Sequence, residues 1–187
     1  MPKRGGTSGV ILVEGVSDQV ALETLAARRG RDLVAERVAV VAIGGAQAIG
    51  SVLRTIGCDD ETRLAGLCDA GEERDFRRAL EQAGLGSNLT RERMETLGFY
   101  VCNADLEDEL IRALGAAAVE NVLERNGNLS SFRTFQKQPQ WAGRSTEDQL
   151  RRFFGSRAGK IKYARVLVEA LDLERVPRPL DGVMTHV

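Results

Sequence analysis

The chain has 187 residues, of which 43% are hydrophobic and 28% charged, and its formal charge is −1; this is the composition of one ordinary globular domain. It has no uninterrupted apolar run of about 18 residues and no signal-peptide pattern, so we expect a cytoplasmic protein without a membrane partner. The chain has three cysteines without CxxC spacing, which argues against a disulfide scaffold and a thiolate zinc site. Its single histidine, His186, lies in what we expect to be a frayed tail, which argues against a histidine base.

The first half of the chain alternates short apolar runs with helical patterns. The apolar runs predict four buried strands, at 9–13, 38–43, 64–68 and 97–102. A helical pattern follows each strand: from Ser17 as N-cap to about Gly30, over 46–56, over 72–83 with Gly84 as C-cap, and over 105–114. Four such repeats predict right-handed crossovers and a parallel sheet, and therefore an α/β fold.

Strand patterns stop after residue 115. Helices are predicted at 116–125, 147–154 and 161–171, with polar stretches at 126–131 and 136–145 between them, and we expect the tail from residue 176 to wrap the surface. We therefore expect an α/β core at 1–115 and a helical C-terminal extension at 116–187, which packs on the core to give one compact domain.

Charge is distributed unevenly along the chain. Residues 1–110 carry 13 basic and 19 acidic side chains, whereas residues 111–187 carry 13 basic and 8 acidic ones. Within 131–165 there are 9 basic and 2 acidic side chains, a net charge of +7. This asymmetry fits a metal pocket beside a polyanion-binding track, and the alternative is the solvated face of an arginine-rich protein.

Carboxylates follow three of the four predicted strands, at the edge where ligands bind to an open parallel sheet. They are Glu14 after the first strand, Asp69, Glu72 and Glu73 after the third, and Asp105 and Glu107 after the fourth. Converging carboxylates without histidine are typical of a hard cation such as Mg²⁺. The alternative for Asp69 and Asp105 is that each only caps a helix, whereas Glu14 closes a strand and has no capping role.

Asp18 lies four residues after Glu14, across a strand-to-helix turn. The two side chains could face one pocket. The alternative is that Asp18 is only an acidic residue in the first turn of a helix, where it is favoured by the helix dipole.

Several segments resemble the Toprim domain of topoisomerases, primases and nucleases of the overcoming-lysogenization-defect (OLD) type. They are Val-Glu-Gly-Val-Ser-Asp at 13–18, Ile-Gly-Gly at 43–45 and Leu-Cys-Asp-Ala-Gly-Glu at 67–72. Asp-Leu-Glu-Asp-Glu-Leu at 105–110 and Lys-Ile-Lys-Tyr-Ala at 160–164 resemble the OLD branch in particular. The similarity spans about 9–171. OLD-type proteins usually carry an ATPase domain, and this sequence has no Walker A pattern, so the resemblance implies a free-standing Toprim protein whose partners include an ATPase or another DNA-processing protein.

The resemblance implies a Toprim (Rossmann-like) fold and Mg²⁺- or Mn²⁺-dependent phosphoryl transfer on nucleic acid. By position it implies Glu14, Asp18, Asp69 and Glu107 as metal ligands, and Glu14, Asp69 and Lys160 as catalytic residues, with Lys162 a close rival to Lys160. The chain departs from the Toprim pattern at Gly71, which replaces the second aspartate of Asp-x-Asp. Glu72 and Glu73 follow immediately and are candidates for the missing ligand.

Three functions are consistent with these residues. The first is an OLD-type nuclease, with DNA favoured over RNA, that holds the backbone through Arg151, Arg152, Arg157 and Lys162 and stacks bases on Phe132, Phe135 or Trp141. The alternative for Phe132 and Phe135 is a core position. The second is a degenerate Toprim protein that binds metal, nucleic acid or a partner without cleaving. The third is a nucleotidyltransferase or hydrolase acting on small nucleotides.

Overall fold

Four strands form one parallel sheet in the computed structural model, which describes residues 9–56, 62–155 and 159–187. The strands are β1 (Gly9–Val13), β2 (Val38–Ala42), β3 (Arg63–Cys68) and β4 (Phe99–Val101). Their order is β2-β1-β3-β4, and all three pairings are parallel. The predicted α/β fold with four parallel strands is confirmed, and β1, the most continuous apolar run, lies at the centre with all five residues buried.

Ten α-helices and two short 3₁₀ helices surround the sheet in the described part of the chain. They are α1 (Val16–Arg28), η1 (Ala46–Ala48), α2 (Ile49–Ile56), α3 (Glu73–Gln82), α4 (Arg91–Thr96), α5 (Leu106–Leu114), α6 (Ala116–Arg125), α7 (Leu129–Gln136), α8 (Thr146–Gly155), α9 (Lys160–Ala170), η2 (Leu173–Arg175) and α10 (Arg178–His186). None of these helices has the length and apolar character required to cross a membrane.

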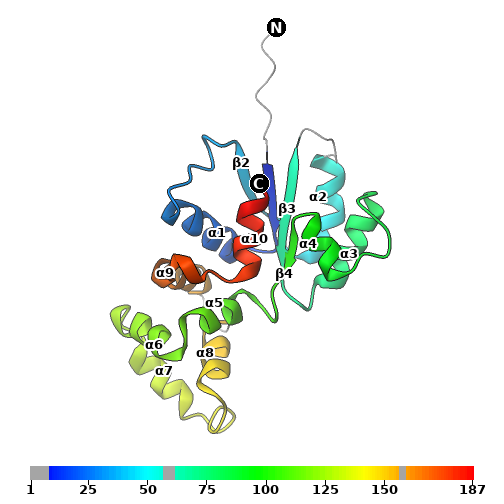
Figure 1. The fold of residues 1–187 in the computed structure, drawn as a ribbon. Helices are drawn as coiled ribbons and strands as arrows, with labels where there is room; N and C mark the ends of the chain where they lie inside the picture. Colours follow the sequence, from blue (N-terminus) through cyan, green and yellow to red (C-terminus); the bar gives the residue numbers. More distant parts are fainter. Residues whose placement is uncertain (1–8, 57–61, 156–158) are drawn as a thin grey trace.

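The sheet is covered on both faces. Helices α1 and α10 lie on one face, with α9 packed against α1, while α2, α3 and α4 lie on the other (Figure 1). Side chains alternate along β1 accordingly: Ile11 and Val13 join the core cluster under α1 and α10, and Val10 and Leu12 join the cluster under α2 and α3. This two-sided burial explains why the strands are continuously apolar rather than alternating.

Helices α5, α6, α7 and α8 lie beyond the carboxyl ends of the strands (Figure 1). Helix α5 leaves β4 directly and contacts both α8 and α9. Helices α5 to α8 therefore stand next to the sheet edge at which the carboxylates were predicted.

The expectation of a frayed tail that wraps the surface was wrong. The tail contains α10, in which Leu180, Val183 and Met184 are buried. These positions have helical spacing, and the proline at the start of the helix is tolerated there because its missing N–H would be unpaired in any case. His186 is packed against the backbone of Gly98 instead of being frayed.

Some local expectations also differ from the structure. Ser17 is not the N-cap of α1, because Gly15 occupies that position and Ser17 is buried in the first turn. Helix α4 was not predicted, and α7 begins inside the stretch 126–131 that was expected to be a polar connection.

Candidate metal centre and its surroundings

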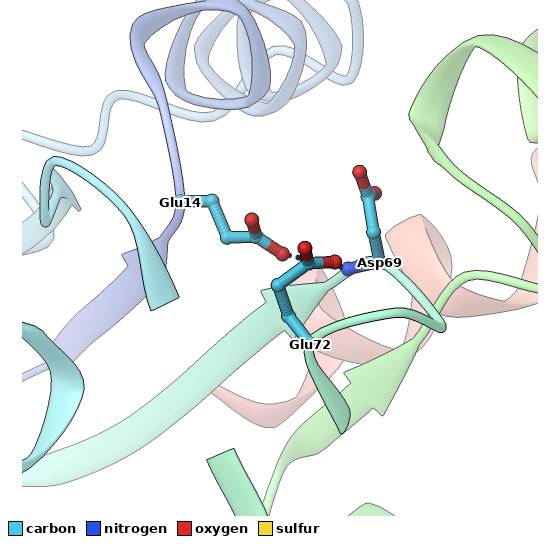
Figure 2. Close-up of side chains that lie close together, drawn as sticks. All are labelled: Glu14, Asp69 and Glu72. Carbon is cyan, nitrogen blue, oxygen red and sulfur yellow. Dashed lines mark hydrogen bonds between the residues drawn. The ribbon is translucent and has the colours of Figure 1, made fainter. Parts of the chain in front are cut away.

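Three carboxylates gather at the carboxyl edge of the sheet. Glu14, Asp69 and Glu72 each offer an oxygen, and these oxygens lie within 4.8 Å of one another (Figure 2). Glu14 follows β1, Asp69 follows β3, and Glu72 occupies the N-cap position of α3. Because β1 and β3 are hydrogen-bonded neighbours, residues 55 apart in sequence meet at adjacent strand ends. We call these three residues the acidic triad.

A hydrogen bond fixes the geometry of the triad. The backbone N–H of Asp69 donates to Oε1 of Glu14 over 2.8 Å. Figure 2 shows the carboxylate of Glu14 directed toward the backbone nitrogen of Asp69. The residue at the N-cap of α3 is Glu72, so the alternative that Asp69 caps this helix does not hold.

The protonation equilibria of the triad are strongly perturbed. Burial, reinforced by the nearby Glu72 and Asp18, raises the pKa of Glu14 from 4.5 to about 7, against the opposing hydrogen bond from Asp69. Burial, together with repulsion from Glu14 and Asp18, raises the pKa of Asp69 from 3.8 to about 8. A divalent cation would replace this repulsion with attraction, so the donor set fits Mg²⁺ or Mn²⁺.

Asp18 lies beside the triad but has a structural role of its own. Its Oδ2 accepts a hydrogen bond from the backbone N–H of Gly15 over 2.9 Å, at the start of α1. Burial raises the pKa of Asp18, while Gly15 and Lys160 oppose the rise. The first-turn role proposed as the alternative for Asp18 is therefore present in the structure.

Glu107 and Lys160 form an ion pair between the starts of α5 and α9. Nζ of Lys160 lies 3.3 Å from Oε1 of Glu107, whose side chain is 8% exposed. Burial raises the pKa of Glu107, and Lys160 opposes this effect. Burial alone would lower the pKa of Lys160, but attraction to Glu107 and Asp18 outweighs it and raises the pKa, so the amine is protonated near neutral pH. Lys162 is exposed and has no part in this pair.

Asp105 is a helix cap, as its alternative interpretation proposed. Its Oδ1 accepts from the backbone N–H of Asp108 over 2.8 Å, and its Oδ2 lies 2.7 Å from Nε of Arg151. Among the arginines predicted to bind nucleic acid, Arg151 is hydrogen-bonded to Asp105 at the start of α5 and Arg152 is exposed. Arg157 lies outside the described residues.

Glu73 and Gly71 flank Glu72 but are placed differently from it. Glu73 pairs with Arg91 over 2.5 Å and with Arg77 over 4.0 Å, and it is not part of the triad. Gly71 is exposed, and a Cβ added to it would meet no atom within 4 Å.

The aromatic residues of the second half are mostly core. Phe132 is fully buried, with its ring centroid 5.2 Å from that of Phe153, and Phe135 is partly buried. The core alternative therefore holds for Phe132, whereas Trp141 is half-buried at the surface.

Sequence reasoning missed Glu109, whose side chain is 4% exposed. Its Oε1 accepts a hydrogen bond from the backbone N–H of Asn103 over 2.7 Å, and its Oε2 pairs with Arg112 over 2.6 Å. Glu109 thereby holds the loop between β4 and α5. Its position in the sequence could have indicated this role, because Glu109 lies four residues after Asp105 and therefore on the same side of α5 as this N-cap residue.

Comparisons with known proteins agree with this description. A family model for the Toprim domain of proteins like the overcoming lysogenization defect protein matches residues 7–58. The C-terminal region of the Xanthomonas campestris pv. campestris OLD protein superposes with a TM-score of 0.74 at 21% identity, covering 97% of this chain and 92% of that one. The C-terminal region of the Burkholderia pseudomallei OLD protein superposes with a TM-score of 0.72 at 17% identity, covering 96% of each chain. No curated protein matches the sequence. Residues 7–58 are therefore similar to the Toprim domain of OLD-like proteins, and the chain as a whole shares the fold of the C-terminal region of OLD proteins.

Proposed function

We propose that this protein is a Mg²⁺- or Mn²⁺-dependent nuclease of the OLD type, which hydrolyses phosphodiester bonds in nucleic acid, with DNA favoured over RNA. The observation that carries this proposal is the acidic triad, Glu14, Asp69 and Glu72, at the carboxyl edge of the sheet. A partly buried like-charge cluster of this kind is costly without a cation, and the neighbouring half of the molecule is rich in arginine.

The triad and its neighbours supply the ligands and charges that phosphoryl transfer needs. Glu14 and Asp69, with Glu72, would hold the first cation, and Asp18 and Glu107 are the candidates for a second. A bound divalent cation supplies Lewis-acid stabilisation of phosphoryl oxygens. Lys160 is held as a protonated cation by Glu107, so its role is to stabilise the negative charge that develops on the phosphate in the transition state.

The placement of Glu72 bears on the departure at Gly71. Glu72 lies in the triad, while Glu73 pairs with arginines. We infer that Glu72 supplies the ligand that the second aspartate of Asp-x-Asp would provide, which favours an active enzyme over a degenerate, binding-only protein. An ATPase or another DNA-processing protein is proposed as its partner.

A metal-dependent assay tests this proposal. Plasmid DNA, single-stranded DNA, RNA and nucleoside triphosphates are incubated with the protein, with Mg²⁺, Mn²⁺ or EDTA. We expect polynucleotide cleavage that requires metal and that is lost in Glu14→Gln and in Glu72→Gln. Glu73→Gln is the matched control, because it removes the same charge one residue away and outside the triad.

Other outcomes of the assay identify the alternatives. Hydrolysis of nucleoside triphosphates alone indicates an enzyme for small nucleotides. Metal-independent binding without cleavage of any substrate indicates the binding-only protein. Cleavage that is lost equally in Glu72→Gln and Glu73→Gln contradicts the ligand role given to Glu72.

A further inference from the structure

An open pocket of about 400 Å³ lies between α8 and the loop that precedes it, next to the start of α5. Its lining residues are Asp105, Trp141, Arg144, Asp148, Arg151, Arg152 and Gly155. The pocket shares no residue with the acidic triad, but Asp105 caps α5 two residues before Glu107. It therefore adjoins the proposed metal centre without being part of it.

The indole ring in this pocket is held on one face by another aromatic ring. Trp141 stacks on Phe135 with ring centroids 5.3 Å apart and an interplanar angle of 24°. Phe135 is itself packed edge-on against the buried Phe153, with centroids 5.6 Å apart. The ring of Trp141 is thus supported from the core, while the side chain is only half-buried and lines the pocket.

The loop that carries the ring is anchored through its backbone. The carbonyl oxygen of Trp141 accepts hydrogen bonds from the backbone N–H of Arg144 over 3.1 Å and from Nε2 of Gln149 over 2.8 Å. Gln149 is 6% exposed, and its Oε1 accepts from Nε2 of Gln136 over 2.6 Å. Because these bonds use the backbone of Trp141, they remain when its side chain is changed.

Two of the three arginines at the pocket are exposed and form no ion pair with the residues that the structure describes. Arg151 is engaged by Asp105, but among the ion pairs of the described residues none includes Arg144 or Arg152. A supported aromatic ring stacks on a base of any identity, and guanidinium groups bind phosphate. The pocket therefore offers the two contacts that one nucleotide needs.

We propose that this pocket binds an unpaired nucleotide of the nucleic-acid strand, with its base stacked on Trp141 and its flanking phosphates on Arg144 and Arg152. In a duplex both faces of a base are covered by its neighbours, so only a single strand or an unpaired end can make this contact. This inference rests on the proposed nuclease function and deepens it, because it names unpaired nucleic acid as the substrate class.

Binding is tested without catalysis, in EDTA. Trp141 is the only tryptophan in the sequence, so the intrinsic tryptophan fluorescence of the whole chain reports on this pocket alone. A strand of about ten thymidylates, a length within the usual range of single-strand sites, is expected to quench this fluorescence saturably. An abasic strand of equal length and a duplex are expected to bind about tenfold more weakly, because base stacking is lost. A uridylate strand of equal length shows whether ribose is accepted.

Variants identify the residues that bind. Arg144→Ala with Arg152→Ala is expected to weaken thymidylate binding about tenfold and to reduce the salt slope by about 1.4, since each phosphate contact on a single strand contributes about 0.7. The matched control is Arg93→Ala with Arg125→Ala, which removes two exposed arginines on α4 and α6 and should leave affinity within about twofold. For Trp141→Ala, a fluorescent label on the strand replaces the lost signal; we expect about tenfold weaker binding, with Trp141→Phe retaining most of the affinity. Melting temperatures show that each variant is folded.

Several results would overturn the inference. These are equal binding of abasic and base-containing strands, equal binding of duplex, no quenching by either the thymidylate or the uridylate strand, or an equal loss in the control variant. Cleavage with Mn²⁺ is measured separately. Cleavage that is unchanged in Trp141→Ala contradicts the pocket and leaves the nuclease proposal standing, whereas stacking without any cleavage contradicts the nuclease proposal and leaves the pocket standing.

Discussion

Gly71 stands two residues after Asp69, where the Toprim pattern has its second aspartate. Its φ lies outside the left-handed region and its Cβ position is open, so an aspartate fits there without strain. Because Glu72 is inferred to supply the missing ligand already, we predict that Gly71→Asp leaves Mn²⁺ binding and cleavage essentially unchanged, with a melting temperature within about 2 °C of the parent, since the substitution buries nothing. Gly71→Asn is the matched control, because it fills the same space without the charge.

Isothermal titration with Mn²⁺ and the cleavage assay check this prediction. If Gly71→Asp binds Mn²⁺ more tightly than Gly71→Asn and cleaves faster than the parent, then the parent site lacks a ligand, and the inferred role of Glu72 is contradicted. If both variants lose activity, the open space at Gly71 is needed for the substrate.

The raised pKa values of Glu14 and Asp69 predict how the stability of the metal-free protein depends on pH. Both carboxyls bind protons more tightly in the folded protein, with pKa values of about 7 and about 8, than at their ordinary values of 4.5 and 3.8. Their contribution to stability is complete below about pH 4 and is lost as pH rises through about 7 to 8. We therefore expect the melting temperature in EDTA to fall between pH 5 and pH 8, by about 2–4 °C for each kcal/mol lost.

Calorimetry in EDTA across this pH range measures the effect, with Glu14→Gln plus Asp69→Asn as the comparison. The double variant cannot titrate at these positions, so its melting temperature should change less over the same range. Parallel curves for the two proteins would mean that the two carboxyls are not the groups whose pKa values are raised.

At the scale of single elements, α10 offers a prediction in which two physical effects have opposite signs. Gly182 lies in the middle of this helix, and a Cβ there would clash with the ring of Tyr100. Alanine is normally favoured over glycine in a helix by about 1 kcal/mol, but here the clash dominates. We predict that Gly182→Ala destabilises the protein by about 1–3 kcal/mol.

The background of Tyr100→Ala reverses this prediction. Without the ring the clash disappears, so Gly182→Ala should then stabilise the protein by up to about 1 kcal/mol. Urea denaturation of the two single variants, the double variant and the parent forms the required cycle. Destabilisation of the same size in both backgrounds would show that α10 does not pack on β4 through this contact.

The elements that sequence patterns predicted well are those whose burial leaves a simple periodic signal. β1 is apolar at every position because helices cover both of its faces, and α6 was predicted with its observed bounds. α10 was missed because two prolines and a glycine mask its apolar spacing, and their tolerance depends on helix-start geometry and on the contact with Tyr100. The helix-start geometry and the contact with Tyr100 depend on tertiary structure, which a local sequence pattern does not specify.

At the scale of the whole molecule, the candidate site joins segments that are distant in sequence. Strand order in a parallel sheet brings Glu14 beside Asp69, so their proximity was predictable. The ion pair of Glu107 with Lys160 depends on the packing of α5 against α9, which sequence spacing does not specify, and so the sequence alone left Lys162 as a rival to Lys160.

Because the triad exists only when β1, β3 and α3 are assembled, metal binding and folding are coupled. A cation that binds only the folded chain stabilises it by about 2.7 kcal/mol at a hundredfold excess over its dissociation constant, which corresponds to a rise in melting temperature of about 5–10 °C for a chain of this size. We predict this rise with Mg²⁺ or Mn²⁺ at pH 8, where a larger fraction of the carboxyls is ionised, and a smaller rise at pH 6, where protons compete more strongly for Glu14 and Asp69. Glu14→Gln with Asp69→Asn should abolish the rise, while Glu73→Gln, which lies outside the triad, should retain it. Differential scanning calorimetry with metal or EDTA makes the comparison, and an undiminished rise in the double variant would mean that the cation binds at another place in the molecule.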